Sequence, residues 1–219
     1  MTRPYVVAID GPAASGKGTL AKRVAEAFEF AYLDTGSLYR AVGVATLRTG
    51  GDPAHPQDAL HSALSFDLNL VNDPAIRSRA AGEAASQVAA HPGVRDALLA
   101  FQRDFSRVPP GGAPGAVLDG RDIGTVVCPN AHVKLFVTAS SEARAHRRWL
   151  ELRRQGEAVE EAQVLQDIRN RDARDAGRAS APMKIADDAL LLDTTELSIE
   201  EAVSSAIALV ANALRLQPK

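Results

Sequence analysis

Residues 5–19 read Tyr5-Val6-Val7-Ala8-Ile9-Asp10-Gly11-Pro12-Ala13-Ala14-Ser15-Gly16-Lys17-Gly18-Thr19, and this stretch decides the fold. Its first five residues form an apolar, partly β-branched run, which predicts a short buried strand. A Gly-rich turn follows, and a helical pattern begins at Gly16, with Leu20, Val24 and Phe28 on one side. A strand, a Gly-rich turn, a lysine and a helix in this order have the spacing of a phosphate-binding loop, or P-loop.

The residue types of this loop suit the phosphates of a nucleotide. Glycines let the backbone bend and come close to the phosphates, so that successive N–H groups point at anionic oxygens. The N-terminus of the following helix adds about half a positive charge, and Lys17 can reach the β- and γ-phosphate oxygens. The expected ATP-binding residues of the loop are Gly11, Pro12, Ala13, Ala14, Ser15, Gly16, Lys17, Gly18 and Thr19.

The loop departs from the simple P-loop pattern at one position. That pattern ends in Gly-Lys followed by Ser or Thr, whereas here Gly18 holds the hydroxyl position and Thr19 comes next. We therefore expect Thr19 to be a ligand of the Mg²⁺ that accompanies ATP, either directly or through water. Asp119 ends a predicted buried strand, and we expect it to hold the Mg²⁺ or its waters. The alternative is that Asp119 is only a turn residue before Gly120.

Short apolar strands alternate with amphipathic helices along the rest of the chain, which predicts an α/β fold with a parallel sheet covered on both faces. Further strands are expected at 31–33, 66–71, 116–118, 133–137 and 189–192. Further helices are expected at 37–49, 80–90, 92–105, 141–156, 162–172 and 199–214. The last helix should begin with a capping box of Ser198 and Glu201. Its buried side should carry Ile199, Val203, Ile207, Val210 and Leu214.

Composition argues against several classes of protein. The formal net charge is −2, from 25 basic and 27 acidic residues, which does not favour binding to nucleic acid or to an anionic membrane. The sequence shows no run of about 18 apolar residues that could span a bilayer, and no apolar signal region before the first strand. Cys128 is the only cysteine, so no internal disulfide can form. We expect a single domain in the reducing cytoplasm.

Several further segments form a pattern that is more specific than the P-loop. They are Asp34-Thr35-Gly36-Ser37-Leu38-Tyr39-Arg40, Ala85-Ser86-Gln87-Val88-Ala89-Ala90-His91-Pro92-Gly93-Val94-Arg95, Asp119-Gly120-Arg121-Asp122-Ile123-Gly124-Thr125, Arg171-Asp172-Ala173-Arg174-Asp175 with Arg178, and Asp187-Asp188-Ala189 through Leu192-Asp193-Thr194. Together with Ile9-Asp10-Gly11-Pro12 and Gly16-Lys17-Gly18-Thr19, they resemble the bacterial cytidylate kinase family from about residue 5 to residue 210.

This resemblance implies a nucleoside monophosphate kinase fold, with a five-stranded parallel P-loop kinase core flanked by helices, a monophosphate-binding insert and a mobile helical lid. Within one domain of residues 1–219, the core would comprise about 1–50, 106–140 and 185–219. The insert would comprise about 51–105 and the lid about 141–184. The insert should be shortened by about a hairpin, because only 66–71 has a strand pattern there.

The resemblance also implies an ATP-dependent kinase that uses Mg²⁺ and transfers the γ-phosphoryl group to CMP or dCMP. It implies a monomer that needs no protein partner. Ser86, Arg95 and Asp122 would recognise the cytosine, because a carboxylate can accept a hydrogen bond from its exocyclic amino group, whereas uracil would present an acceptor. The alternatives are a helix-packing role for Ser86, a surface arginine at Arg95 and a loop or cap residue at Asp122.

Other residues matched by the resemblance would hold the phosphate and ribose of the acceptor. Arg40, Arg121 and Arg178 are expected at the phosphate with Thr35 close by, because a dianion that approaches an anionic donor needs several cations around it. No general base is expected, because a phosphate dianion is already a nucleophile.

The predicted lid has an unusual charge pattern: nine arginines, eight acidic residues and no lysine lie between Glu142 and Arg178. Arg171 and Asp175 would hold the ribose and the phosphate region, unless Asp175 only pairs with an arginine of its own helix. The candidates for the ATP phosphates are Arg147, Arg148 and Arg174. The expected catalytic residues are Lys17, Arg121, Arg174 and Arg178.

Two other functions fit parts of the pattern. An adenylate- or uridylate-type kinase would share the P-loop, but Asp122 with Ser86 and Arg95 favours cytosine. A nucleotide-dependent switch would bind ATP without transferring phosphate, and it would not explain why several arginines converge on a second anion.

Overall fold

The strand before the P-loop is the central strand of a parallel sheet. The chain is described from a computed structural model that covers residues 3–219, so Met1 and Thr2, at the start of the predicted core, lie outside the described residues. The five strands are β1 (Tyr5–Asp10), β2 (Ala31–Asp34), β3 (Gly115–Gly120), β4 (Val133–Thr138) and β5 (Leu190–Asp193). They pair in the order β2-β3-β1-β4-β5, all parallel. The predicted α/β class and its five-stranded parallel core are therefore confirmed.

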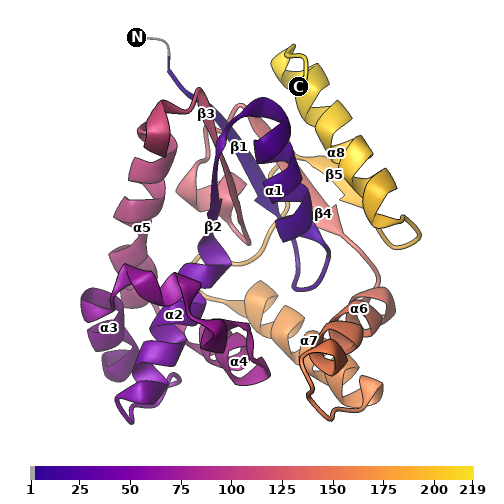
Figure 1. Ribbon diagram of the computed structural model, residues 1–219. Coiled ribbons are helices and arrows are strands. Elements are labelled where there is room, and N and C mark those ends of the chain that lie inside the picture. The colour runs from indigo at the N-terminus through magenta and orange to yellow at the C-terminus, as the bar shows by residue number, and fades with distance from the viewer. Residues whose placement is uncertain (1–2) are drawn as a thin grey trace.

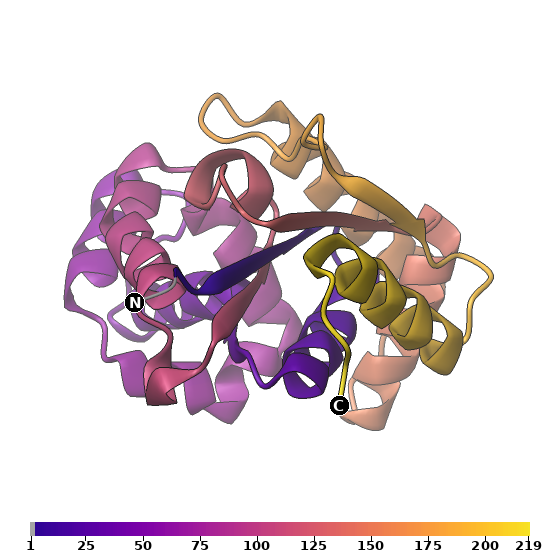
Figure 2. The ribbon, with the colours of Figure 1, turned by 90° about the horizontal axis from the view of Figure 1, so that it is seen from above.

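Helices cover both faces of the sheet, as the continuous burial of β1 from Val7 to Asp10 requires. Val7 and Ile9 face α1 (Lys17–Phe28) and α8 (Ile199–Leu214), whereas Ala8 faces the other side. That side is covered by α5 (Pro92–Arg107) and by η4 (Ile123–Val127), a short π-helical turn. Figure 2 shows α1 and α8 on one side of the strands and the turn after β3 on the other.

Two groups of helices lie beyond the carboxyl ends of the strands (Figure 1). The first group contains α2 (Thr35–Arg48), α3 (Pro56–Ser65) and α4 (Arg79–Val88), which share one apolar cluster with part of α5. The second group is the pair α6 (Ser141–Arg154) and α7 (Glu161–Gly177), with its own cluster around Leu152 and Ile168. Because parallel strands present their carboxyl ends at one edge, both groups enclose the edge where ligands bind in such sheets.

The predicted strand at 66–71 is wrong. The segment forms the 3₁₀-helix η1 (Leu68–Asn72), followed by η2 (Pro74–Arg77). The alternating leucines misled the prediction, since Leu68 is largely exposed. Asp67 and Asp73 instead cap the two turns, accepting hydrogen bonds at 2.8 Å from the backbone N–H groups of Asn69 and Ala75. Residues 51–105 therefore contain no strand, and α3, which was not predicted, lies in this segment.

Other differences from the predicted elements concern their ends. The helix predicted at 162–172 continues to Gly177, so α7 also carries Asp175. The capping box of Ser198 and Glu201 is confirmed, but Ile199 is 67% exposed and does not belong to the buried side of α8. A further 3₁₀-helix, η3 (Pro110–Gly112), lies in the loop before β3. None of the helices within residues 3–219 contains an apolar stretch of the length that a membrane span requires.

Candidate active site

The P-loop connects β1 to α1, and its glycines are structurally required. Gly11 has φ +149°, and a Cβ atom there would lie 2.0 Å from the carbonyl oxygen of Val137, so only glycine fits. Gly16 is the N-cap of α1 in the left-handed region, with φ +86°. It offers no side chain to the N–H groups of the first turn, which therefore remain available for an anion.

Lys17 begins α1 beside two carboxylates at the carboxyl ends of neighbouring strands: Asp34 is the last residue of β2, and its register partner Asp119 is the last but one of β3. Burial and the nearby Arg121 lower the pKa of Lys17, and the two carboxylates partly offset that shift. Burial and the charge of Asp34 raise the pKa of the Asp119 carboxyl, while Lys17 opposes the shift. Tyr32 donates a hydrogen bond to Asp119 Oδ1 at 3.1 Å. Asp119 is thus a buried, hydrogen-bonded carboxylate facing the loop and not only a turn residue.

The residues near Asp119 fit a magnesium ion better than Thr19 does. A Cβ atom at Gly18 would lie 3.7 Å from Asp119 Oδ2 and from the Tyr32 hydroxyl, so position 18 faces this carboxylate. Thr19 is exposed, and among residues 3–219 no hydrogen bond joins it to Asp119. Asp119 with the neighbouring Asp34 matches the way Mg²⁺ is held, by one or two carboxylates together with phosphates and water.

A small cavity of about 40 Å³ lies at the carboxyl ends of β2 and β3, and most of the predicted CMP-binding residues line it. They reach it from α2, α5, α7 and the segment that follows β3. The seven that line it are Thr35, Arg95, Arg121, Asp122, Arg171, Asp175 and Arg178. The hydroxyl of Thr35 donates to the carbonyl oxygen of Asp119 at 2.7 Å, which fixes the start of α2 against β3.

Arg95 and Asp122 form a buried ion pair in this cavity, with 7% and 5% of their surfaces exposed. The Arg95 guanidinium also lies 5.6 Å from the centre of the Tyr39 ring. Arg95 is therefore not a surface arginine. Asp122 does not cap the turn that follows it, because its side chain makes no capping hydrogen bond there within the described chain. Both planar groups are held in place at one wall of the cavity.

Asp175 is fully buried and gathers three arginines from two parts of the chain. It accepts a hydrogen bond from Arg121 Nε at 2.9 Å and pairs with Arg178, while Arg171 Nε lies 3.9 Å away. Burial alone would raise the pKa of Asp175, but the three guanidinium groups hold it below its ordinary value. Burial, and then the nearby Arg121, lowers the pKa of Arg171 to about 9. Three cations around one carboxylate leave a net positive site suited to an anion.

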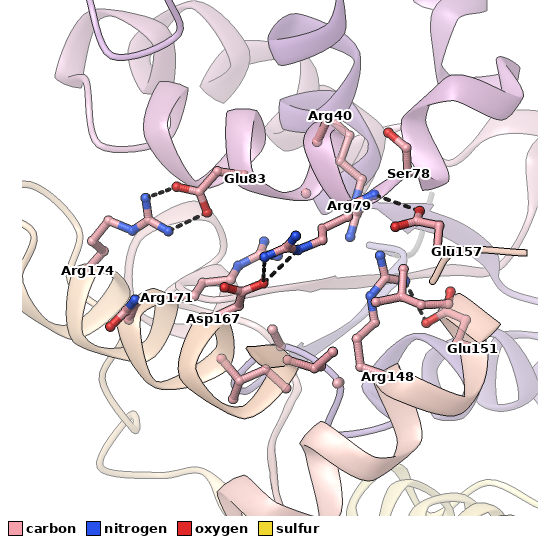
Figure 3. A pocket seen from close by; sticks show the side chains of 18 of the residues that line it. Arg40, Ser78, Arg79, Glu83, Arg148, Glu151, Glu157, Asp167, Arg171 and Arg174 are labelled. Carbon is pink, nitrogen blue, oxygen red and sulfur yellow. Dashed lines mark hydrogen bonds and ion pairs between the residues drawn. The ribbon is translucent and has the colours of Figure 1, made fainter. Parts of the chain in front are cut away.

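A larger cleft of about 1000 Å³ separates α4 from the pair α6 and α7 and reaches Ala13 and Ala14 of the P-loop. Besides these two P-loop residues, four predicted arginines line it: Arg40, Arg148, Arg171 and Arg174. Figure 3 shows that Arg174 points across the cleft to Glu83 of α4, and the two form a two-bond ion pair.

Several predicted residues are placed apart from these two cavities. Arg147 lines neither, and its Nη1 donates to the Thr194 hydroxyl at 3.1 Å. That hydroxyl lies 3.1 Å from the Ser15 carbonyl oxygen, so Arg147 is one residue removed from the P-loop. Ser86 is buried on α4 between Ala85 and Ala89, which do line the small cavity. Its hydroxyl finds no hydrogen-bond partner among the described residues, which is unfavourable unless a ligand supplies one.

Comparisons with known proteins agree on one family. The profile of the family described as cytidylate kinase matches residues 7–212. A cytidylate kinase of Rhodospirillum rubrum is 58% identical over 207 residues, which cover 94% of this chain and 97% of that protein. A cytidylate kinase of Caulobacter sp. strain K31 is 56% identical over 209 residues, covering 95% of each chain. The chain belongs to the cytidylate kinase family.

Solved structures with much lower identity support the fold alone. A gluconokinase from Sinorhizobium meliloti 1021 superposes with a TM-score of 0.51 at 15% identity, covering 98% of this chain and 97% of the other. A shikimate kinase from Bacteroides thetaiotaomicron gives a TM-score of 0.50 at 12% identity, covering 97% and 99%. This chain thus shares its core architecture with these two structures.

Several residues of the site were not predicted from the sequence of this cytidylate kinase family member. Asp10, Tyr32 and Tyr39 lie in or beside the quoted motifs, and their polarity within apolar strand or helix patterns was the available signal. Glu83 has no local signal, because its partner Arg174 is 91 residues away.

Proposed function

We propose that this protein transfers the γ-phosphoryl group of ATP to CMP or dCMP and yields ADP with CDP or dCDP. The observation that carries the proposal is the position of the Asp175 arginine cluster. It lies beside the buried Arg95–Asp122 pair in a single cavity at the same sheet edge as the P-loop. A P-loop alone accounts for ATP binding. The second cationic site, with a fixed carboxylate next to it, accounts for an acceptor that has a phosphate and a base.

On the donor side, the backbone N–H groups from Gly11 to Thr19 would hold the phosphates, and Lys17 would stabilise the charge that develops on the γ-phosphoryl group. When bound, Mg²⁺ would neutralise phosphate charge and orient the β- and γ-phosphates. Asp119 is the residue best placed to hold it through oxygen or water. Thr19 remains a candidate only through water, given its exposure.

On the acceptor side, the net positive cluster would bind the monophosphate and keep it close to the donor despite their like charges. The Asp122 carboxylate, fixed by Arg95, would accept from the exocyclic amino group of cytosine. The unpartnered hydroxyl of Ser86 would supply a further contact to the base. Uracil would leave these buried groups without partners, which disfavours it strongly.

Of the helices beyond the carboxyl ends of the strands, those within about 51–105 would act as the monophosphate-binding insert and those within about 141–184 as the lid, while α2 belongs to the core. Arg148 and Arg174 lie on the lid side of the large cleft, where closure over ATP would bring them to the phosphates. Closure would also exclude water and limit ATP hydrolysis. We infer a monomer in the cytoplasm that needs no protein partner, with ATP and CMP or dCMP as its ligands.

A coupled assay of ADP release with CMP, dCMP, UMP and AMP tests the proposal. We expect rapid turnover with CMP or dCMP and much slower turnover with UMP and AMP. A rate with AMP equal to the rate with CMP would contradict the proposed acceptor. ATP consumption that none of the four stimulates would favour a nucleotide-dependent switch.

A further inference from the structure

Asp10 is a buried carboxylate that has no role in the binding of either nucleotide as proposed above. Asp10 ends β1 and directly precedes Gly11, the first residue of the P-loop, yet it is only 5% exposed. Its two oxygens each accept one backbone hydrogen bond, from the N–H of Ile123 at 2.8 Å and from that of Gly124 at 2.7 Å. These residues lie 113 and 114 positions further along the chain. With one donor on each oxygen, the carboxylate faces the backbone of a distant turn.

The turn that Asp10 holds is η4, which begins immediately after Arg121 and Asp122. In this π-type turn, the N–H of Val127 bonds to the Asp122 carbonyl oxygen and that of Cys128 to the Ile123 carbonyl oxygen. The first N–H groups of such a turn have no partner within it. Asp10 takes both of them and so fixes the backbone at the residue that follows Asp122.

The side of η4 that faces away from Asp10 is also closely packed. A Cβ atom at Gly124 would lie 3.1 Å from Lys134 Cδ and 3.4 Å from Asp10 Oδ2. The Lys134 ammonium in turn pairs with Asp188 at 2.8 Å. Gly124 thus lies between the carboxylate from β1 and the lysine stem from β4, and the turn has little room to shift.

Keeping this carboxylate inside the protein costs free energy. Burial raises the pKa of Asp10 to about 6, although the two backbone hydrogen bonds act in the opposite direction. If the end of this central strand only had to pack against its neighbours, an apolar residue there would avoid the free-energy cost of burying a carboxylate. The geometry therefore points to a role in placing the turn.

We propose that Asp10 is a positioning residue for acceptor recognition, which sets the location of Arg121 and Asp122 relative to the P-loop. Asp10 is covalently joined to the donor loop and hydrogen-bonded to the acceptor turn, so it is a short link between the two. A shift of about 1 Å in such a link is enough to impair catalysis. The proposal rests on the proposed function, because Arg121 and Asp122 are there the contacts to the acceptor.

The test compares Asp10→Asn and Gly124→Ala with the wild type. Asp10→Asn keeps the shape but turns an amide NH₂ towards one of the two N–H groups, whereas Gly124→Ala pushes the turn from the other side. For both variants we expect KM for CMP to rise about 10-fold, which for Asp10→Asn corresponds to the loss of about one hydrogen bond. The preference for CMP over UMP in kcat/KM should fall, while the Kd for ATP, measured by titration without acceptor, stays unchanged.

Thr46→Val is the matched control, because Thr46 is also fully buried, and among residues 3–219 its hydroxyl bonds only to the Val42 carbonyl oxygen, far along α2. It should lower Tm and leave both KM for CMP and the base preference unaltered. If Asp10→Asn and Gly124→Ala lower Tm and change neither of those quantities, Asp10 is only structural. An equal loss of ATP affinity would assign Asp10 to the P-loop instead and overturn the proposal.

The substrate preference of the wild-type protein tests the proposed function separately from the positioning role of Asp10. A wild-type protein that prefers another monophosphate would contradict the proposed acceptor. In that case a selective rise in KM for that other acceptor in Asp10→Asn would still support the positioning role.

Discussion

The donor side and the acceptor side of the cleft are built by different means. The P-loop is one continuous segment that would bind phosphate mainly through backbone N–H groups, and its shape depends on Gly11 and Gly16. The acceptor cavity is made of side chains from α2, α5, α7 and the segment after β3. Those side chains are already joined in ion pairs, such as Arg95–Asp122 and Arg121–Asp175.

This difference between backbone and side-chain binding groups indicates which side of the cleft can be specific for one base. Backbone groups present the same donors whatever the side chains are, so a P-loop recognises phosphate and little else. Buried side-chain pairs have a fixed orientation and an incomplete set of partners, so they can select one base. The two sides should therefore respond differently to substitution, and each can be altered with little effect on the affinity of the other.

The largest effect is expected on the donor side, from Lys17→Ala. Loss of this cation removes an electrostatic contact that strengthens in the transition state, which typically costs ~3–4 kcal/mol, or about 10²–10³-fold in kcat. The Kd for CMP should stay within about twofold, since Lys17 serves the donor. Lys22→Ala, an exposed lysine of the same helix, is the control and should leave kcat unaltered. A weakened Kd for CMP equal to the loss in kcat would mean that the two sides are not separable.

A somewhat smaller effect is expected on the acceptor side, from Asp122→Ala. The variant removes the acceptor for the cytosine amino group and leaves Arg95 buried without its partner, so kcat/KM for CMP should fall about 10–100-fold. The rate with UMP should fall less, and the Kd for ATP should not change. Steady-state kinetics with both acceptors, alongside an ATP titration, measure the three quantities. Unchanged CMP kinetics would remove Asp122 from base recognition.

The smallest effect concerns the contact between the two helical groups. Glu83→Gln releases Arg174 from a pair whose side chains are 48% and 34% exposed. Exposed pairs contribute about 0.2–1 kcal/mol, so KM for ATP should fall by about fivefold at most, because Arg174 is freed for phosphate. Asp104→Asn, in the exposed Asp104–Arg107 pair of α5, is the control and should have no effect on KM. A higher KM for ATP in Glu83→Gln would show that Glu83 assists binding.

The same contrast explains how much the sequence could predict. The strand, turn and helix of the P-loop were predicted correctly because each requirement is local: a β-branched strand, glycines at the bends and a helix start. The buried strands β3 and β4 were also predicted, since short apolar runs bounded by turn residues allow few alternatives. The strand at 66–71 failed because Asp67 and Asp73 favour capped turns over an alternating pattern with no surface to pack on.

The acceptor residues came from the resemblance, and the structure brings most of them to one cavity. The sequence could not predict which of these side chains form ion pairs with one another. Arg95 and Asp122 are 27 residues apart, and Arg121 and Asp175 are 54 apart. Neither local propensity nor spacing constrains such contacts. The exposure of Thr19, by contrast, could have been foreseen, since a change of one position on a helix turns a side chain by about 100°, away from the side that position 18 turns to Asp119.

The fully buried Asp175 has a consequence for the speed of the catalytic cycle. Without Asp175, the three arginines would repel one another and turn towards solvent. Each binding event would then have to bring their guanidinium groups together again. With the carboxylate between them, the cluster is assembled when the protein folds. If this cluster binds the acceptor phosphate as proposed, an arriving phosphate would need little reorganisation of the arginines, and a departing product would leave the cluster intact for the next turnover.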